Sequence, residues 1–447
     1  MAEITRDQPV TVAPEPIAEM PATSEPVAKA ESPLSRFGFR FAFCYFVLYF
    51  FPFPLDNIPG LEIVAQPVTA FWHALGVWVG KALFGVEITV FTNGSGDTTY
   101  DYLKALCNLV LALAASGVWS VLDRRRPTPP RLREALRVYL RFGLGSILIV
   151  YGAMKVIPSQ FPPPTLDRLL QPFGDASPMG LLWTFMGASA AYTIFSGAAE
   201  LTAGLLLALR RTTLLGALLA VGVMTNVVML NYCYDVPVKL FSSHLLVMAL
   251  YLMVPDLPRL AAFFVRNRPV VPEVHQPLFR HPRWELAGKV VATLFVLWTA
   301  GSMLYSAWQT TGMYGMWAKK SPLYGLWNVV EQETDGQARP PLVTDATRWR
   351  RVTFDRPQTV GIQLMNDSRV RYDIALDLDK GTLELKKRDD PNWKTTLTLA
   401  RPEPDRLDLA GEIDGQKHRL HLERGEIPSF RLRERGFHWI NEWPFNK

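Results

Sequence analysis

Cysteine is scarce in this chain of 447 residues: only Cys44, Cys107 and Cys233 occur, in different apolar regions and without a Cys-x-x-Cys pair. This spacing disfavours a thiol relay, a structural zinc site and an attached c-type haem, so we assign no metal site. A b-type haem has little support, because His244 is joined only by His73, which lies outside the expected spans. The sequence also lacks a flavin or nicotinamide fingerprint, so any redox role would require an electron partner.

Long apolar runs are present. The chain is 49% hydrophobic and 12% aromatic, yet 20% of its residues are charged, which indicates a membrane part joined to a soluble part. A helix needs about 20 apolar residues to cross a bilayer. Seven runs are of about that length: 38–54, 102–122, 136–156, 186–208, 213–231, 239–255 and 287–309.

The residues before the first run are rich in Pro, Ala and Glu and show no apolar periodicity, which predicts a disordered tail over 1–36. The first apolar run begins too late for a signal peptide and has no small-residue cleavage site, so we expect a retained anchor.

Arginine is concentrated in alternate loops, and the loops between them contain almost no Lys or Arg. The positive-inside rule then predicts a cytoplasmic N-terminus and a C-terminal domain outside the cytoplasmic (inner) membrane. Segment 68–85 competes as an eighth span, but crossing would scramble the arginine asymmetry, so we expect an interfacial helix within the N-terminal region 37–134. No basic stripe lies on the soluble domain, so the bilayer, and not nucleic acid, is the expected partner.

The C-terminal region 322–447 alternates apolar and polar residues in about nine short runs separated by turn residues, which predicts an antiparallel β-barrel. The fold class is therefore mixed: a polytopic α-helical membrane bundle followed by a barrel. Gly325-Leu326-Trp327 at the start, with Arg433 or Arg435 after the last strand, resembles the lipocalin or calycin pattern, which implies that Trp327 and Arg435 close the barrel bottom. The interior of such a barrel is either filled by side chains or holds one small ligand.

Ionisable residues inside spans are functional hypotheses by default. Arg141 and Glu200 come out at similar depth near the cytoplasmic side, which predicts an intramembrane ion pair or, alternatively, a role in ligand or proton handling. Gly197 and Gly204 share the face of Glu200, which lets another helix approach closely.

A second polar group is expected near the outer boundary, beneath the proline loop 159–164 and Trp183. Converging amide, carboxylate, amine and imidazole groups suit a small polar ligand. The predicted ligand-binding residues are Lys155, Asn226, Asp235, Lys239 and His244. Each also has an ordinary explanation: Lys155 reaching the headgroups, His244 as a hydrogen-bonded core residue, and Asp235 as the cap of the sixth span. Lys239 opposes the helix dipole there, so it needs a contact with Asp235 or a ligand.

Region 135–255 resembles the DoxX-like family of membrane proteins, through "RFGLGSILIVYGAMKVI" and "SGAAELTAGLLLALRRTTLLGA". The resemblance implies a four-helix core, followed here by a region 256–321 that holds a cytoplasmic loop, the last span and a linker. Some members are associated with quinone-linked oxidation or membrane redox complexes.

Three functions follow from these observations. The first is a protein that binds a quinone, its possible cofactor, in the outer polar cluster as part of a membrane redox system with a partner protein. The alternative is a non-enzymatic envelope protein that anchors an exported lipocalin-like barrel, which binds a lipid or a protein. A small-solute transporter ranks last, because we find no inverted repeat.

Overall fold

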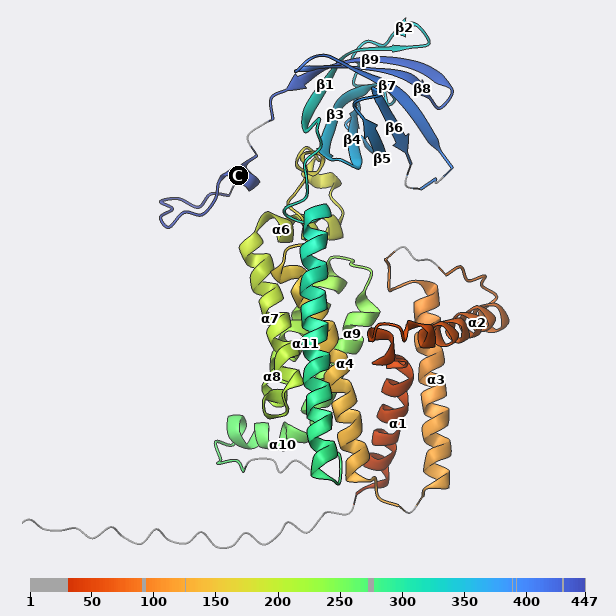
Figure 1. The fold of residues 1–447 in the computed structure, drawn as a ribbon, viewed down its shortest axis with the longest axis vertical. Coiled ribbons are helices and arrows are strands. Elements are labelled where there is room, and N and C mark those ends of the chain that lie inside the picture. Colours follow the sequence, from red (N-terminus) through yellow and green to blue (C-terminus); the bar gives the residue numbers. More distant parts are fainter. Residues whose placement is uncertain are drawn as a thin grey trace, which may run out of the picture.

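Figure 1 shows a computed structural model of the chain, in which a bundle of helices carries a β-barrel at one end. The structure describes residues 31–90, 94–124, 126–271, 277–387, 389–390, 392–427 and 430–446. Most of the predicted tail, residues 1–30, lies outside the described residues.

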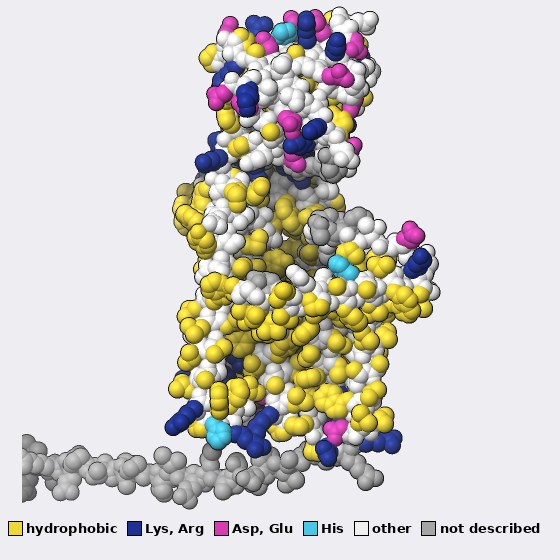
Figure 2. Space-filling view, turned by 45° about the vertical axis from the view of Figure 1, so that its right-hand side comes forward, with side chains coloured by type: hydrophobic (Ala, Val, Ile, Leu, Met, Phe, Trp, Pro, Cys, Tyr) yellow, Lys and Arg dark blue, Asp and Glu magenta, His cyan; other side chains and the backbone are white. Residues whose placement is uncertain are grey.

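The helices are α1 (Pro33–Phe50), α2 (Ala65–Phe84), α3 (Thr99–Leu122), α4 (Pro130–Val156), α5 (Leu166–Leu169), α6 (Pro178–Ala188), α7 (Ala190–Ala208), α8 (Thr213–Cys233), α9 (Lys239–Met253), α10 (Leu257–Leu260), α11 (Pro282–Met313) and α12 (Arg431–Glu434). Among the described residues, seven helical stretches are long and apolar enough to cross a membrane, as predicted. Figure 2 shows their apolar surface, with Lys and Arg gathered at the end of the bundle away from the barrel.

Two helix boundaries differ from the sequence prediction. Helix α1 begins at Pro33, inside the predicted tail, because Ser32 caps it by accepting a hydrogen bond from the Ser35 amide. The predicted fourth span is interrupted at Ser189, whose backbone is extended between α6 and α7. Helix α2 is not among the candidate spans, and it lies across the end of α3 instead of alongside it (Figure 1).

Glycines bring α4 and α7 into close contact. A Cβ atom on Gly152 would lie 2.5 Å from the Leu201 amide nitrogen, and one on Gly204 would lie 2.7 Å from the Gly145 carbonyl oxygen. Larger side chains at these positions would force the two helices apart. The face that the sequence marked with small residues is therefore the packing surface between α4 and α7.

The barrel strands are β1 (Gly325–Thr334), β2 (Gln337–Ala338), β3 (Trp349–Arg356), β4 (Thr359–Leu364), β5 (Arg369–Asp377), β6 (Thr382–Lys386), β7 (Lys394–Glu403), β8 (Arg406–Ile413) and β9 (Gln416–Gly425). Each strand pairs antiparallel with its neighbour, and β1 also pairs with β9, so eight strands close into a barrel with β2 at its rim. The predicted mixed architecture is thus confirmed.

Side chains fill the barrel interior. A single cluster of buried apolar residues runs through it, and Phe354, Leu397 and Leu422 in that cluster have no exposed surface. Of the two interiors that the sequence left open, the filled one is observed. This makes the barrel a rigid body whose ligand, if it has one, binds elsewhere.

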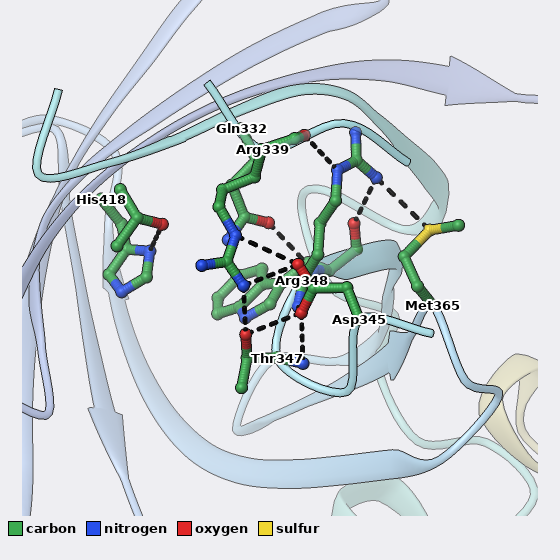
Figure 3. A network of polar contacts seen from close by, with 9 residues as sticks. Gln332, Arg339, Asp345, Thr347, Arg348, Met365 and His418 are labelled. Carbon is green, nitrogen blue, oxygen red and sulfur yellow. Dashed lines mark hydrogen bonds and ion pairs between the residues drawn. The ribbon is translucent and has the colours of Figure 1, made fainter. Parts of the chain in front are cut away.

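The rim near β2 is closed by a polar network (Figure 3). The Arg348 side chain is only 1% exposed, and its Nε donates to the Arg339 carbonyl oxygen over 2.8 Å. Asp345 accepts hydrogen bonds from the backbone amides of Thr347 and Arg348 and from the Arg339 guanidinium. The loop between β2 and β3 is thereby fixed across the barrel end.

The predicted partner of Trp327 is wrong. Trp327 is 1% exposed and its Nε1 donates to the Leu323 carbonyl oxygen over 3.0 Å. The residue opposite Trp327 on the last strand is Arg424. Arg435 follows α12, beyond the end of β9, and its guanidinium contacts Asn441 and the Phe445 ring. The chain leaves the barrel at Gly425, and Arg435 contacts residues of the C-terminal segment and not Trp327.

Candidate functional site

The barrel sits on the bundle through a short connection between α4 and α6. Helix α5 lies against the outer wall of strands β3 to β5, and Asp167 on α5 is only 7% exposed. Arg371 Nε lies 2.6 Å from Asp167 Oδ2, and Arg369 donates both to Asp167 Oδ1 over 3.3 Å and to the Asp167 carbonyl oxygen over 2.8 Å. A buried carboxylate thus holds two arginines of β5, which ties the barrel to the bundle.

The barrel wall is shaped to receive α5. Gly361 on β4 faces Asp167, and a Cβ atom there would lie 3.0 Å from the Asp167 side chain. Asp355 on β3 accepts hydrogen bonds from the amides of Leu166 (2.8 Å) and Asp167 (3.4 Å) at the start of α5. The contact between α5 and the barrel therefore combines close packing at Gly361 with hydrogen bonds to the Asp355 carboxylate.

A cavity of about 310 Å³ lies beside this contact. Its walls come from both parts of the protein: the proline loop, Trp183 of α6 and Tyr314 after α11 on the bundle side, and the turn between β3 and β4 on the barrel side. The size is at the lower end of the range for ligand pockets, about 300 to 1,000 Å³. It suits the polar head of a molecule better than a whole lipid.

The charged residues lining the cavity are three arginines (Arg168, Arg356 and Arg371) and two aspartates (Asp167 and Asp355), so positive charge is in excess. Arg371 is bound to Asp167, whereas the half-buried Arg356 guanidinium has no hydrogen-bond or ion-pair partner among the described residues. Arg356 is therefore available to a ligand.

Burial disfavours the charged forms of both Arg356 and Asp355, which line the cavity. It lowers the pKa of Arg356 from its ordinary value, and the nearby Asp355 carboxylate opposes that change. Burial also raises the pKa of Asp355, while the amide hydrogen bonds from Leu166 and Asp167 lower it. A desolvated guanidinium whose nearest carboxylate is already bound to α5 would gain from an anionic ligand.

The predicted ion pair between Arg141 and Glu200 is not present. Glu200 instead pairs with Lys155, whose Nζ lies 2.9 and 2.7 Å from the two carboxylate oxygens, between α4 and α7. Arg141 donates to the carbonyl oxygens of Leu207 and Ala208 at the end of α7. The glycine contacts fix the relative height of the two helices and place Lys155, one turn from Gly152, within reach of Glu200.

Lys239 and Asp235 lie at the barrel end of the bundle. Lys239 Nζ is 2.8 Å from Asp235 Oδ1, which confirms the expected contact at four residues' spacing. The expected cap is wrong: Asp97, from the loop before α3, accepts the amides of Lys239 and Leu240 over 2.8 and 2.9 Å. Asp235 has a left-handed backbone with φ of 50° and does not accept these amides. Asp97 Oδ2 also lies 3.7 Å from Lys239 Nζ, so two carboxylates account for the lysine without a ligand.

His244 faces α1. Its Nδ1 lies 2.7 Å from the Leu240 carbonyl oxygen, which can only accept, so Nδ1 carries a proton. A neutral ring then accepts at Nε2 from the Tyr45 hydroxyl, 2.6 Å away, and the Tyr49 ring stacks on the imidazole at 4.2 Å. Asn108 on α3 is buried nearby, where it donates to the Tyr45 carbonyl oxygen while its own Oδ1 has no partner among the described residues.

The predicted outer cluster is therefore dispersed. Lys155, the Asp235–Lys239 pair and His244 have separate partners, and Asn226 is exposed on the surface of α8. The proline loop and Trp183, which the sequence predicts above the cluster, line the cavity instead. Sequence reasoning missed Arg356, Asp167 and Arg371, because nothing local to a strand or loop indicates which distant element it contacts.

No family model matches the chain, and no solved structure matches it. One curated protein does match: YwoB of Bacillus subtilis (strain 168), described as an uncharacterized protein, is 35% identical over 146 residues. These residues make up 31% of this chain and 91% of YwoB. Since nearly the whole of YwoB is matched, the chain belongs to the family of YwoB.

Proposed function

We propose that this protein is a multi-pass protein of the cytoplasmic (inner) membrane that binds the anionic head group of a membrane amphiphile in the cavity between bundle and barrel. The single observation that carries the proposal is Arg356, a half-buried cation without a partner among the described residues, in a cavity bounded by both parts of the protein. This is the envelope-protein alternative, with the ligand between the two domains instead of inside the barrel.

The position of the cavity favours a membrane-derived ligand. It lies where the spans end and the barrel begins, and aromatic residues such as Trp183 and Tyr314 line it, as is typical of the bilayer interface. The gathering of Lys and Arg at the opposite end supports a cytoplasmic location for that end, with the N-terminus inside and the barrel outside (Figure 2). A reporter fused after Lys447 should be active only outside the cytoplasm, and cytoplasmic activity would reverse this topology.

Lipid extraction tests the ligand. The purified protein should release an acidic amphiphile in stoichiometric amount, measured by mass spectrometry, and Arg356→Gln should lose most of it. Arg406→Gln, on an exposed part of the barrel far along the chain from the cavity turn, is the matched control and should retain it. Equal recovery from both variants would contradict the proposal. Adding back phosphatidylglycerol or soluble glycerol phosphate to stripped protein separates a lipid from a free anion, and the proposal requires the lipid to bind more tightly.

A quinone is the second candidate ligand, which retains the DoxX-like redox interpretation with a membrane redox partner. The observation that favours it is Asn108 Oδ1, which lies beside the Tyr45–His244 pair and has no partner in the described part of the chain. A hydroquinone hydroxyl could donate to this oxygen, and the Tyr45 hydroxyl could turn to a ring oxygen. In the same extraction, a quinone that is lost in Asn108→Ala but retained in Arg356→Gln would favour this second function.

A further inference from the structure

The C-terminal segment 430–446 contrasts with the barrel before it. Its large apolar side chains are almost fully exposed: Trp439 is 91% exposed, Trp443 84%, and Phe437 and Ile440 76% each. Monomeric soluble domains rarely expose so many aromatic residues together. Because exposed apolar area of this size is unfavourable in water, we expect these side chains to be buried against another surface.

The segment has a defined shape of its own. The Arg435 guanidinium lies 3.9 Å from the centre of the Phe445 ring and donates to Asn441 Oδ1 over 2.6 Å. The Phe437 and Trp439 rings meet edge to face at 5.0 Å. These contacts hold a compact loop, in which the Arg431 guanidinium also lies 5.8 Å from the centre of the Phe445 ring.

The place of the segment in the fold indicates what covers it. Figure 1 shows that the chain turns back from the barrel toward the bundle after β9, and that the segment projects sideways just above α6. In Figure 1 this is the level at which α11, the longest candidate span, ends on the barrel side. Tryptophan and phenylalanine with neighbouring arginines are typical of the headgroup layer, where rings enter the acyl boundary and guanidinium groups meet phosphates.

We infer that segment 430–446 is an interfacial anchor that inserts its aromatic side chains into the outer surface of the lipid bilayer, beside the bundle. This goes beyond the proposed function, since the segment contributes no residue to the cavity. It provides the barrel with an attachment to lipid in addition to its attachment to α5.

A spin label in the full chain tests the inference. The label is attached through His438→Cys, which leaves every aromatic residue of the segment in place, in a Cys233→Ser background that removes the exposed native thiol. Lys380→Cys, on an exposed turn of the barrel, is the control. In phosphatidylcholine nanodiscs with phosphatidylglycerol, the label at 438 should collide with oxygen several-fold more, relative to a water-soluble nickel reagent, than the label at 380.

The double change Trp439→Ser with Trp443→Ser should return the label at 438 to an aqueous environment while the protein still folds, because neither residue packs in the barrel core. Equal nickel access at 438 and 380 in nanodiscs would overturn the inference. So would a label that is immobile and shielded from both reagents in detergent as well as in nanodiscs, because that result would mean that protein covers the segment. Loss of cavity ligand has no effect on these readings, so the two proposals can fail separately.

Discussion

Two interfaces of this protein are built around buried carboxylates, and they differ in whether a cavity and a further cation lie beside the ion pair. Between α4 and α7, glycines bring the helices together, and Glu200 and Lys155 neutralise each other. Between α5 and the barrel, Asp167 is likewise neutralised, yet a cavity remains beside it, with Arg356 unpartnered among the residues that the structure describes. The first interface is a structural joint, whereas the second also contains the cavity in which we propose that a ligand binds.

The largest expected effect is at Glu200. Glu200→Ala leaves the Lys155 charge buried without its partner, which in general costs about 3–5 kcal/mol. The thermal unfolding midpoint in detergent should fall sharply. The double variant Lys155→Met with Glu200→Met should recover most of the loss, because no lone charge remains. If the double variant is as unstable as the single one, the ion pair has a role beyond neutralisation.

The next effect is at Asp167. Asp167→Asn weakens the contacts with Arg369 and Arg371, and charged hydrogen bonds of this kind contribute about 1.5–3 kcal/mol each. Hydrogen exchange should increase at α5 and along β4 and β5, whereas the barrel interior should keep its protection. Asp405→Asn, at an exposed turn of the barrel, is the control. Unchanged exchange at α5 would mean that the connecting chain alone holds the barrel in place.

A smaller effect separates the two carboxylates near Lys239. Asp97→Ala removes the cap of α9 and should cost about 1 kcal/mol, within the usual range for helix caps. Asp235→Ala should cost less, because that carboxylate is 82% exposed in its pair with Lys239. Urea or thermal unfolding of the two variants side by side measures the difference. A larger loss of stability in Asp235→Ala than in Asp97→Ala would mean that Asp235 is the more important carboxylate for the start of α9.

The smallest effect at neutral pH concerns Asp345 in the barrel rim. Burial raises its pKa, but hydrogen bonds from Thr347, Arg339 and Arg348 outweigh this and hold the pKa well below its ordinary value. A depressed carboxyl pKa stabilises the fold above the unfolded value, about 3.9, and this contribution disappears as the pH falls toward the folded value. The barrel should therefore lose stability on acidification, and Asp345→Asn should make its unfolding midpoint less dependent on pH below about 4.

The sequence predicts features that depend on neighbouring residues. The spans follow from apolar runs, the strands from alternation, and the Asp235–Lys239 contact from helical spacing. It does not predict Asp97 as the cap of α9, because the two are 142 positions apart. Depth estimated from the span ends pairs Arg141 with Glu200, but α4 begins at Pro130 and the glycine contacts set a different register. The cavity depends on the meeting of two domains, which no local pattern records.

The barrel is attached to the bundle at two separate points, the linker after α11 and the ion-paired α5. A body held at a single point can swivel, whereas one held at two points has a fixed heading. Gly361 lets α5 lie flat on the barrel wall, and it therefore helps to fix the direction in which the chain leaves the barrel. Under the anchoring that we infer for segment 430–446, the chain emerging from β9 would meet the bilayer on one side of the bundle, so each molecule would have a front and a back in the plane of the bilayer.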